Sequence, residues 1–346
     1  MSDSYGVAQS ANRQFRHFML KEIFEQGAVI QQCLEQYLPP LELEDFSGID
    51  QIHILACGTS LNAGLIAQYW FEQIAGIPTQ ARSSSEFLSA PMIATPNTLT
   101  IAVTQSGETA DTIAAIKTVS SRRIAITNGI DSTITKFVDQ TFYTHAGQEK
   151  SVAATKTFTA QLILFCCLAL MIAYQKQRLN DQQLQYWCDQ LHQLPNQIEI
   201  ELQQEDQIAA IAQTLVNTRD LIILGSGINT AIAAEAALKL KETTYTHAEG
   251  YAAGEFLHGP IALLDDQIPV LAILTPDESG ARVQKALDRI QSNGSKTISI
   301  SALSTQHPAL MPFLTILPFQ LLAYYLAIAR QIDVDQPRNI TKSLTN

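Results

Sequence analysis

Residues able to do acid–base chemistry are concentrated in one stretch of the chain, EAALKLKETTYTHAEGYAAGEFLHGP, at residues 235–260. If residues 231–243 form a helix, Glu235, Lys239 and Glu242 are spaced by four and three residues and share one helix face. A neighbouring lysine favours the ionised carboxylate, whereas burial in an apolar wall opposes it, and the balance can make a carboxylate a general base near neutral pH. A solvent-exposed ion pair explains the same spacing equally well.

The other ionisable residues of this stretch carry different expectations. Lys241 points away from the shared face and is expected to be exposed, while Glu249 and Glu255 fit either a structural or a site role. His258 precedes Gly-Pro and therefore lies outside a continuing helix. A loop histidine beside a rigid turn can act as a general acid or base, although a single histidine is more often structural.

Two segments rich in Gly, Ser and Thr, CGTSLNAG at 57–64 and TQSGETADT at 104–112, each follow an apolar run. Where a strand ends and a helix begins, unpaired backbone N–H groups and the helix dipole attract anions, and hydroxyls add neutral donors. Ordinary helix capping explains one such loop. Thr104, Ser106 and Thr109 are more hydroxyls than one cap needs. The two loops therefore predict a phosphate site at the carboxyl edge of a parallel sheet.

Apolar runs followed by small polar residues and then by a helical pattern recur along the chain, as in strand–loop–helix units on a parallel sheet. The predicted strands are 52–56, 99–103 and 123–127 in a first cycle and 221–224, 270–274 and 297–300 in a second. Because the two cycles begin alike and are each of domain size, the sequence predicts a duplicated α/β domain. Residues 17–38 are expected to be helical. The apolar run 162–174 predicts a buried helix, because its 13 residues are too few to cross a bilayer.

The expected organisation has four parts. They are an N-terminal segment with a helix (1–40), a domain with the phosphate loops (41–180), a domain with the catalytic helix (181–330) and an extended C-terminal arm (331–346). A Gln-rich helical segment is expected to connect the two domains.

Composition and motifs argue against several classes of function. The 346 residues are 46% hydrophobic and 16% charged with a formal net charge of −11, which argues against nucleic acids and membrane surfaces as partners. The five cysteines follow no metal-ligand spacing and are expected to be reduced thiols in a cytoplasmic protein, and no signal peptide is expected. GSGINT at 225–230 lacks the third small residue of a dinucleotide fingerprint, and no Walker lysine or GxSxG motif is present.

Six motifs in a fixed order resemble one family over nearly the whole chain, from HFMLKEIFEQ to DVDQPRNITKS. They are ACGTS, SGETADT, VAATK, ALKLKE, HAEGYAAGEFLHGP and DVDQPRN. The chain resembles the sugar isomerase (SIS) family, and most closely the isomerase half of the glucosamine-6-phosphate synthases. The resemblance implies two tandem SIS domains, each a parallel five-stranded sheet between helix layers, in a homodimer. It also implies fructose 6-phosphate or glucosamine 6-phosphate as substrate, with no metal or organic cofactor.

The same resemblance implies a role for each matching residue. The phosphate and nearby hydroxyls of the sugar would contact Ser60, Thr104, Gln105, Ser106 and Thr109, with Thr59 in the same loop and Val152 beside the sugar.

For the chemistry, the resemblance implies that Glu242 moves a proton between C1 and C2, with Lys239 as the neighbouring helix lysine. His258 would assist ring opening across the dimer interface. Lys342 would form a Schiff base with the open-chain ketose as an amine nucleophile.

Two departures from the synthases leave alternatives open. The chain begins Met1-Ser2, without the N-terminal cysteine of a glutaminase domain, so nitrogen is expected from free ammonia or from a separate glutaminase. Ala154 replaces the serine of the usual VASTK, which resembles stand-alone aminosugar-phosphate deaminases. The alternatives are therefore a glucosamine-6-phosphate deaminase, a fructosamine-phosphate deglycase or a non-catalytic sugar-phosphate sensor. The presence of Glu242, His258 and Lys342 argues against a sensor, which has no use for a base.

Overall fold

The computed structural model describes residues 13–38, 45–292, 294–304 and 307–342. The predicted N-terminal segment up to residue 12 and the last four residues of the predicted arm lie outside these ranges. The chain divides into two compact units, each containing one parallel sheet. Of the described residues, those within 28–149, 156–193 and 341–342 form the five-strand unit, and those within 13–27, 150–155 and 194–340 form the four-strand unit.

The sheet of the five-strand unit has the strand order β2-β1-β3-β4-β5, and all of its pairings are parallel. Its strands are β1 Gln51–Ala56, β2 Thr79–Ser83, β3 Thr98–Thr104, β4 Arg122–Thr127 and β5 Gln140–Tyr143. The three predicted strands of this region are confirmed as β1, β3 and β4. The sequence did not reveal β2 and β5, because these short edge strands are largely polar (TQARS and QTFY) and lack an apolar run.

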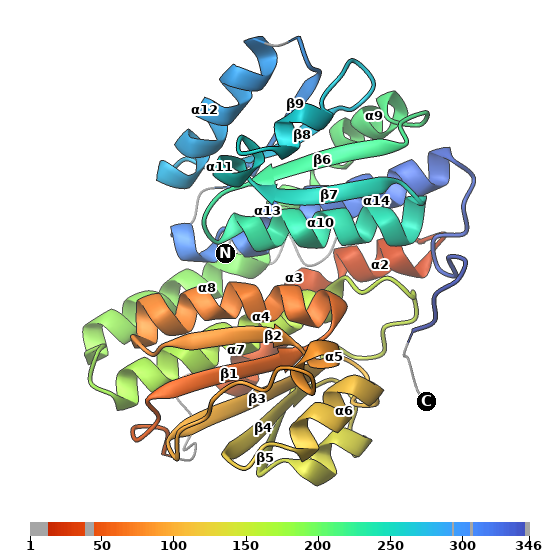
Figure 1. Ribbon diagram of the computed structural model, residues 1–346. Coiled ribbons are helices and arrows are strands. Elements are labelled where there is room, and N and C mark those ends of the chain that lie inside the picture. The colour runs from red at the N-terminus through yellow and green to blue at the C-terminus, as the bar shows by residue number, and fades with distance from the viewer. Residues whose placement is uncertain (1–12, 39–44, 293, 305–306, 343–346) are drawn as a thin grey trace, which may run out of the picture. The chain divides into compact units, whose positions relative to one another are not determined.

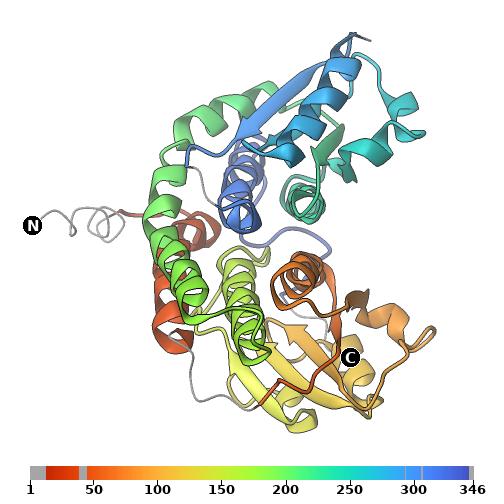
Figure 2. The same ribbon diagram turned by 90° about the vertical axis from the view of Figure 1, so that its left-hand side faces the viewer.

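Helices cover both faces of this sheet. The helices in this part of the chain are α3 Gln26–Tyr37, α4 Gly58–Trp70, α5 Ser84–Phe87, α6 Ala110–Lys117, α7 Lys156–Gln175 and α8 Asp181–Leu202, with short π and 3-10 segments at Phe71–Ala75 and Thr133–Phe137, and of these α4, α5, α6 and α7 contact the strands. Figure 2 shows α4 and α7 side by side over one face. Side chains alternate across β1, so Ile54 faces Gly64 of α4 whereas Leu55 packs with Phe87 and Ala115 on the other face.

The sheet of the four-strand unit has the order β7-β6-β8-β9 and is also parallel. Its strands are β6 Asp220–Gly225, β7 His247–Ala252, β8 Val270–Leu274 and β9 Thr297–Ser301. The three predicted strands are confirmed, but the described residues form four strands here and not the expected five. The sequence did not reveal β7, because HAEGYA alternates weakly and continues a stretch dominated by helical residues.

Helices also cover both faces of the second sheet (Figure 1). They are α2 Phe18–Phe24, α9 Glu205–Thr214, α10 Asn229–Thr244, α11 Ala253–Phe256, α12 Glu278–Ser292, α13 Pro312–Thr315 and α14 Leu317–Ala329, with 3-10 turns at Pro260–Leu263 and Pro308–Leu310. Leu224, Phe256 and Leu287 belong to one buried cluster with α11 and α12, while α10 packs against α14 and α14 against α9.

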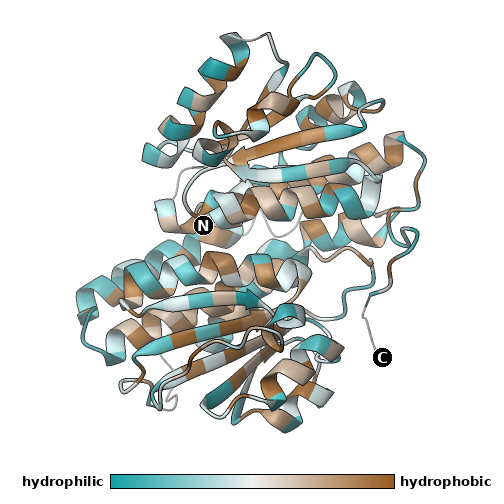
Figure 3. Ribbon diagram, in the orientation of Figure 1, coloured by the Kyte–Doolittle hydropathy of each residue, from teal (hydrophilic) through white to brown (hydrophobic). Residues whose placement is uncertain are grey.

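Buried apolar residues dominate the central strands and the core helices, and Figure 3 shows β1 and β6 mostly brown. The predicted buried helix at 162–174 is confirmed, but α7 begins earlier, at Lys156. The apolar run did not reveal this first part, because it contains the polar residues Thr157, Thr159 and Gln161, which are buried as well. Two segments, Lys156–Gln175 and Pro308–Ala329, are long and apolar enough to cross a membrane by length and composition. Of their most apolar windows, 94% and 89% are buried within the protein, as in core helices.

Candidate active site

The two predicted phosphate loops lie next to each other in the five-strand unit. Ala56 at the end of β1 is paired in register with Val103 near the end of β3, so the loops that follow start at the same sheet edge. In the order β2-β1-β3-β4-β5, the chain leaves β1 and β3 towards opposite sides of the sheet. Such a switch point is where open α/β sheets bind ligands.

The first loop turns directly into α4. Cys57 precedes the helix in an extended conformation, and Gly58 has a positive φ of 55°, which glycine adopts without strain. Ser60 lies in the first turn of α4, and its Oγ accepts a hydrogen bond from Nε2 of the buried Gln161 at 3.0 Å. This bond uses an acceptor site of Ser60, so the hydroxyl proton of Ser60 stays available for a ligand oxygen.

The second loop is fixed by its own hydrogen bonds. The hydroxyls of Thr104 and Thr109 lie 2.7 Å apart, and the backbone N–H of Glu108 donates to Ser106 Oγ at 3.1 Å. Gly107 has a φ of 73°, and a Cβ there would lie 1.8 Å from Ser132 Oγ, so no larger residue fits. The loop therefore presents a defined set of hydroxyl and N–H groups.

A carboxylate ties the second loop to the segment after β4. The backbone N–H of Thr133 donates to Glu108 Oε1 at 2.8 Å. Hydrogen bonding from Thr133 lowers the pKa of Glu108 below its ordinary value, which keeps this carboxylate charged. The charge stabilises the loop geometry.

A cavity of about 630 Å³ opens beside this loop within the five-strand unit. Of the predicted site residues, Gln105, Ser106 and Lys342 line it, whereas Thr59, Ser60, Thr104 and Thr109 are not among its lining residues. The other lining residues are Gln32, Asn128, Gly129, Ile130, Tyr143, His145, Gly147, Gln148 and Glu149. The cavity thus combines amide, hydroxyl, amine and carboxylate groups.

Asn128 organises one wall of this cavity. Its Oδ1 accepts from Thr144 Oγ1 at 2.9 Å and from the Ala146 N–H at 3.0 Å, and its Nδ2 donates to the Gly147 carbonyl at 2.7 Å. The intervening His145 has a positive φ of 48°, a conformation that costs a non-glycine residue free energy. The sequence did not single out Asn128, because its partners lie on another loop.

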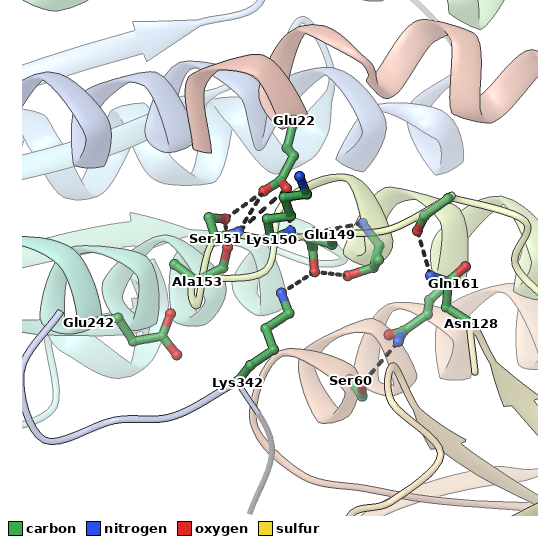
Figure 4. Close-up of polar contacts among 12 residues, drawn as sticks. Glu22, Ser60, Asn128, Glu149, Lys150, Ser151, Ala153, Gln161, Glu242 and Lys342 are labelled. Atoms are coloured by element: carbon green, nitrogen blue, oxygen red, sulfur yellow. Dashed lines mark hydrogen bonds and ion pairs between the residues drawn. The ribbon is translucent and has the colours of Figure 1, made fainter. Parts of the chain in front are cut away.

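Glu149 is the second residue that the sequence analysis missed. Its side chain is 0% exposed, and its Oε2 lies 2.5 Å from Nζ of Lys342, whose side chain is 26% exposed (Figure 4). Thr157 in the first turn of α7 donates its N–H to Glu149 Oε1 at 3.2 Å and its hydroxyl to Oε2 at 2.7 Å. The only sequence signal is that Glu149 lies three residues before Val152 of the VAATK motif.

In the four-strand unit, the predicted charged face of α10 is confirmed. Nζ of Lys239 lies 2.5 Å from Oε2 of Glu242 and 3.4 Å from Oε1 of Glu235. The exposed fractions of the side chains are 1% for Lys239, 0% for Glu235 and 22% for Glu242. A solvent-exposed ion pair is therefore the wrong interpretation for Lys239 and Glu235. Glu242 alone of the three is partly open, and Lys241 is exposed as predicted.

His258 does not lie near Glu242 within this unit. It is exposed after α11, beyond the carboxyl end of β7, whereas Glu242 lies near the end of α10, close to the start of β7. Gly250 in the middle of β7 packs against Ala233 and Ala234 of α10. Glu242 lies eight residues further along α10 than Ala234, which is about 12 Å towards the start of β7. His258 comes after α11, beyond the carboxyl end of β7. Figure 1 shows α11 and the end of α10 at opposite ends of β7.

Val152 lies in a segment that is anchored from α2. The carboxylate of the buried Glu22 accepts hydrogen bonds from the Lys150 N–H at 2.5 Å and the Ser151 hydroxyl at 2.6 Å, and the Ser151 N–H lies 3.3 Å from Oε2 (Figure 4). The Val152 N–H donates to the carbonyl of Asp335 at 3.1 Å. A carboxylate that satisfies several backbone donors fixes the segment containing the predicted sugar neighbour.

Glu249 and Glu255, which the sequence left undecided, differ in the structure. Glu249 lies on β7 and accepts a hydrogen bond from the Tyr251 hydroxyl, while Glu255 is exposed on α11.

The cysteines are free thiols, as expected. Burial raises the pKa of Cys33 to about 12 and also raises the pKa of Cys166, Cys167 and Cys188. Because the thiolate is the reactive form, these four thiols are unsuited to nucleophilic catalysis. Among the described residues, no group of three or more His, Cys, Asp or Glu side chains could hold a metal ion.

Comparison with known proteins adds a family to this geometry. A family model described as SIS domain matches residues 45–171 and 214–317. The glutamine–fructose-6-phosphate aminotransferase (isomerizing) of Synechocystis sp. is 45% identical over 96% of this chain and 59% of its own length, so the chain spans about three fifths of that relative.

Two solved structures are also similar. The C-terminal domain of glucosamine-fructose-6-phosphate aminotransferase from Francisella tularensis is 33% identical with a TM-score of 0.89, covering 93% of this chain and 99% of that one. A glucosamine-6-phosphate deaminase from Thermotoga maritima, at 22% identity and a TM-score of 0.76 over 95% of this chain and all of its own, shares the fold.

Proposed function

Because the chain belongs to the SIS domain family and corresponds to the isomerase half of relatives named glutamine–fructose-6-phosphate aminotransferase, we propose that it interconverts fructose 6-phosphate and glucosamine 6-phosphate. The observation that carries the proposal is the α10 cluster, in which the buried Lys239 contacts the partly exposed Glu242. Moving a proton between C1 and C2 of an open-chain sugar needs one base on one face of the two carbons. A partly accessible carboxylate, held by an adjacent ammonium, meets that need.

The five-strand unit supplies the phosphate site in this proposal. The loops after β1 and β3 carry Ser60 and Ser106 at the start of helices or turns, where hydroxyls and N–H groups hold phosphate without a counter-charge. Gln105 adds an amide donor, and Thr59, Thr104 and Thr109 complete the hydroxyl set. Binding energy at the phosphate, far from the reacting carbons, orients C1 and C2 and lowers the barrier to proton transfer.

Glu242 is the base in this mechanism. It takes the proton from C1 of the open-chain amino sugar intermediate and delivers it to C2, while the contact from Lys239 at 2.5 Å holds the carboxylate in position. Glu235, which lies on the other side of Lys239, balances the buried ammonium.

Lys342 supplies the amine that opens the reaction. As a primary amine on the wall of the cavity, it attacks the ketose carbonyl and forms a Schiff base, which ammonia then displaces. Val152 contacts the sugar in this proposal.

His258 assists ring opening from a second copy of the chain. Within one protomer it lies at the other end of β7 from Glu242, so a site that uses both residues takes them from two chains, as in a symmetric homodimer.

The nitrogen donor is ammonia, free or delivered by a separate glutaminase. The same residues serve the reverse reaction, the deamination of glucosamine 6-phosphate, and no cofactor is invoked in either direction.

A coupled assay tests the proposal in both directions. Purified protein is incubated with glucosamine 6-phosphate, following ammonia and fructose 6-phosphate, and then with fructose 6-phosphate and ammonium, following the amino sugar. The expected result is turnover that Glu242→Gln reduces by at least about 10²-fold. Sugar-phosphate binding without turnover in either direction would overturn the proposal and leave a sensor.

A further inference from the structure

The proposed mechanism assigns no role to Glu149, although its carboxylate contacts the amine of Lys342. It is fully buried, yet Glu149 lines the cavity together with Lys342, and its Oε2 lies 2.5 Å from the Lys342 amine. A carboxylate without access to solvent is costly unless its charge is compensated. The amine of Lys342 and the two donors of Thr157 provide that compensation.

A helix-capping role for Glu149 explains its contacts with Thr157 but not its contact with Lys342. Thr157 donates its N–H to Oε1 and its hydroxyl to Oε2, so a cap alone would already be satisfied. The additional contact from Oε2 joins Glu149 to a lysine 193 positions away in the sequence. Lys342, unlike Glu149, is partly exposed and is therefore the member of the pair that a ligand in the cavity can reach.

Lysine attacks a carbonyl only as the neutral amine, so its ammonium must first lose a proton. When substrate covers the partly exposed Lys342 and displaces water, transfer of that proton to the buried carboxylate replaces two charges with two neutral groups, which a low-dielectric site favours. Oε2 of Glu149 is already at hydrogen-bond distance from Nζ and needs no rearrangement to accept the proton.

We propose that Glu149 is the acid–base catalyst for Schiff-base formation on Lys342, an inference that rests on the proposed function. First, the Lys342 ammonium transfers a proton to the Glu149 carboxylate. The neutral amine then attacks C2 of open-chain fructose 6-phosphate, and the proton on nitrogen moves to the former carbonyl oxygen to give a neutral carbinolamine. Finally, Glu149 returns its proton to the carbinolamine hydroxyl, and water leaves. The products are a protonated imine, water and the original carboxylate, so atoms and charge balance.

Thr157 is a positioning residue in this scheme. Its two hydrogen bonds hold the Glu149 carboxylate in one orientation. Figure 4 shows the Glu149 carboxylate directed at Lys342. Thr157→Val removes the hydroxyl bond but keeps the carboxylate and the N–H donor. It is therefore the matched control for changes at Glu149.

Reductive trapping measures the step directly. The 346-residue chain is mixed with fructose 6-phosphate and borohydride, and the rate at which the reduced sugar adduct appears on the Lys342 peptide is followed by mass spectrometry. Glu149→Gln is expected to slow trapping by at least about 10²-fold, because an amide cannot accept the proton. Thr157→Val is expected to slow it by less than about tenfold. The melting temperature and fructose 6-phosphate binding are measured for each variant.

Chemical rescue separates catalysis from structure. In Glu149→Ala, the space left by the side chain admits formate, and added formate is expected to restore trapping in a concentration-dependent way. This variant decides the question if Glu149→Gln does not fold. Trapping by folded Glu149→Gln at the wild-type rate, or the lack of any rescue in folded Glu149→Ala, would overturn the inference.

The coupled assay keeps the inference distinct from the proposed function. Wild-type protein that turns over substrate but forms no adduct on Lys342 overturns the roles of Glu149 and Lys342 and leaves the proposed interconversion of the two sugar phosphates standing. Wild-type protein that turns over neither glucosamine 6-phosphate nor fructose 6-phosphate overturns both.

Discussion

Gln161 controls which way the Ser60 hydroxyl can point. The buried amide donates to Ser60 Oγ, so the Ser60 proton is directed elsewhere, and in the proposed site it meets a phosphate oxygen. Residues of this kind are invisible to sequence analysis, because Gln161 and Ser60 are separated by 101 positions. Glu149 and Lys342 are 193 positions apart. The motifs identified Ser60 and Lys342, but only the fold identifies what holds them.

Gln161→Glu reverses this hydrogen bond. A carboxylate accepts the Ser60 proton, which turns the hydroxyl away from phosphate and adds a negative charge nearby. The KM for fructose 6-phosphate is expected to rise by at least about tenfold, which corresponds to about 1.4 kcal/mol, with kcat changed far less. Gln161→Leu, which removes the donor without adding charge, is the control and is expected to have a smaller effect. An unchanged KM in a folded Gln161→Glu variant would show that Ser60 does not contact phosphate.

His53 gives a residue-scale prediction about pH. Burial, with a smaller contribution from the charge of Arg82, lowers the pKa of His53, so the folded protein favours neutral imidazole. The unfolded chain binds a proton once the pH falls below about 6.5, and the folded chain does so only at lower pH. The contribution of His53 to stability is therefore complete above about pH 6.5 and is lost as the pH falls towards the folded-state pKa.

Thermal unfolding at a series of pH values tests this effect. His53→Asn is expected to lose less stability than wild type between about pH 7 and pH 5. The control is His247→Asn, since His247 also lies on a parallel strand but is exposed, and this variant is not expected to reduce the loss of stability. Parallel pH profiles for His53→Asn and wild type would contradict the assignment.

At the scale of elements, the sequence pattern predicted the central strands and the charged face of one helix correctly. The central strands β1, β3, β4, β6 and β8 are confirmed, because a mostly apolar run of this length fits a buried strand. The shared face of Glu235, Lys239 and Glu242 on α10 is confirmed, because residues three and four apart lie together on a helix. The edge strands β2, β5 and β7 were missed, because half-exposed positions tolerate polar residues. The anchoring of residues 150–153 by α2 depends on tertiary contacts that carry no local signal.

Glu22 on α2 provides the test of that anchoring. Its carboxylate accepts from the Lys150 N–H, the Ser151 N–H and the Ser151 hydroxyl, and Glu22→Gln places an NH₂ group against these donors. Leaving buried donors unpaired is expected to cost about 1–3 kcal/mol of unfolding free energy, measured by denaturant titration.

The matched control for Glu22→Gln lies one turn further along. Glu25 pairs with Lys21 at 3.1 Å on the surface, so Glu25→Gln is expected to change the unfolding free energy by no more than about 0.5 kcal/mol. Equal effects of the two substitutions would mean that the carboxylate of Glu22 does not hold the segment.

At the scale of the whole molecule, the fold sets how the catalytic residues can combine. Resemblance to the SIS family predicted the α/β class and its duplication, because six ordered motifs cover nearly the full chain. It also implied that one site combines Glu242 with His258 of a second subunit, and within one protomer α10 and α11 keep these two residues at opposite ends of β7. The proposed site is therefore shared between two copies.

Mixing two inactive variants tests this sharing. Glu242→Gln and His258→Asn are each expected to be inactive alone. In a mixed dimer, one site receives both substitutions and the other receives neither, so co-expression restores roughly a quarter of wild-type activity if the chains pair at random. Double-variant protein mixed with wild type is the control. No restored activity, with mixed dimers demonstrated by tagged purification, would mean that each site uses its own His258.

The central claim is that Glu242 moves a proton between C1 and C2, and fructose 6-phosphate carrying deuterium at C1 tests it most directly. With ammonium present, NMR follows the label in the product. We predict that the wild-type protein breaks one C1–deuterium bond for each glucosamine 6-phosphate formed, and that Glu242→Gln slows this step by at least about 10²-fold while still binding the sugar phosphate. Bond breaking at the wild-type rate in folded Glu242→Gln would contradict the mechanism.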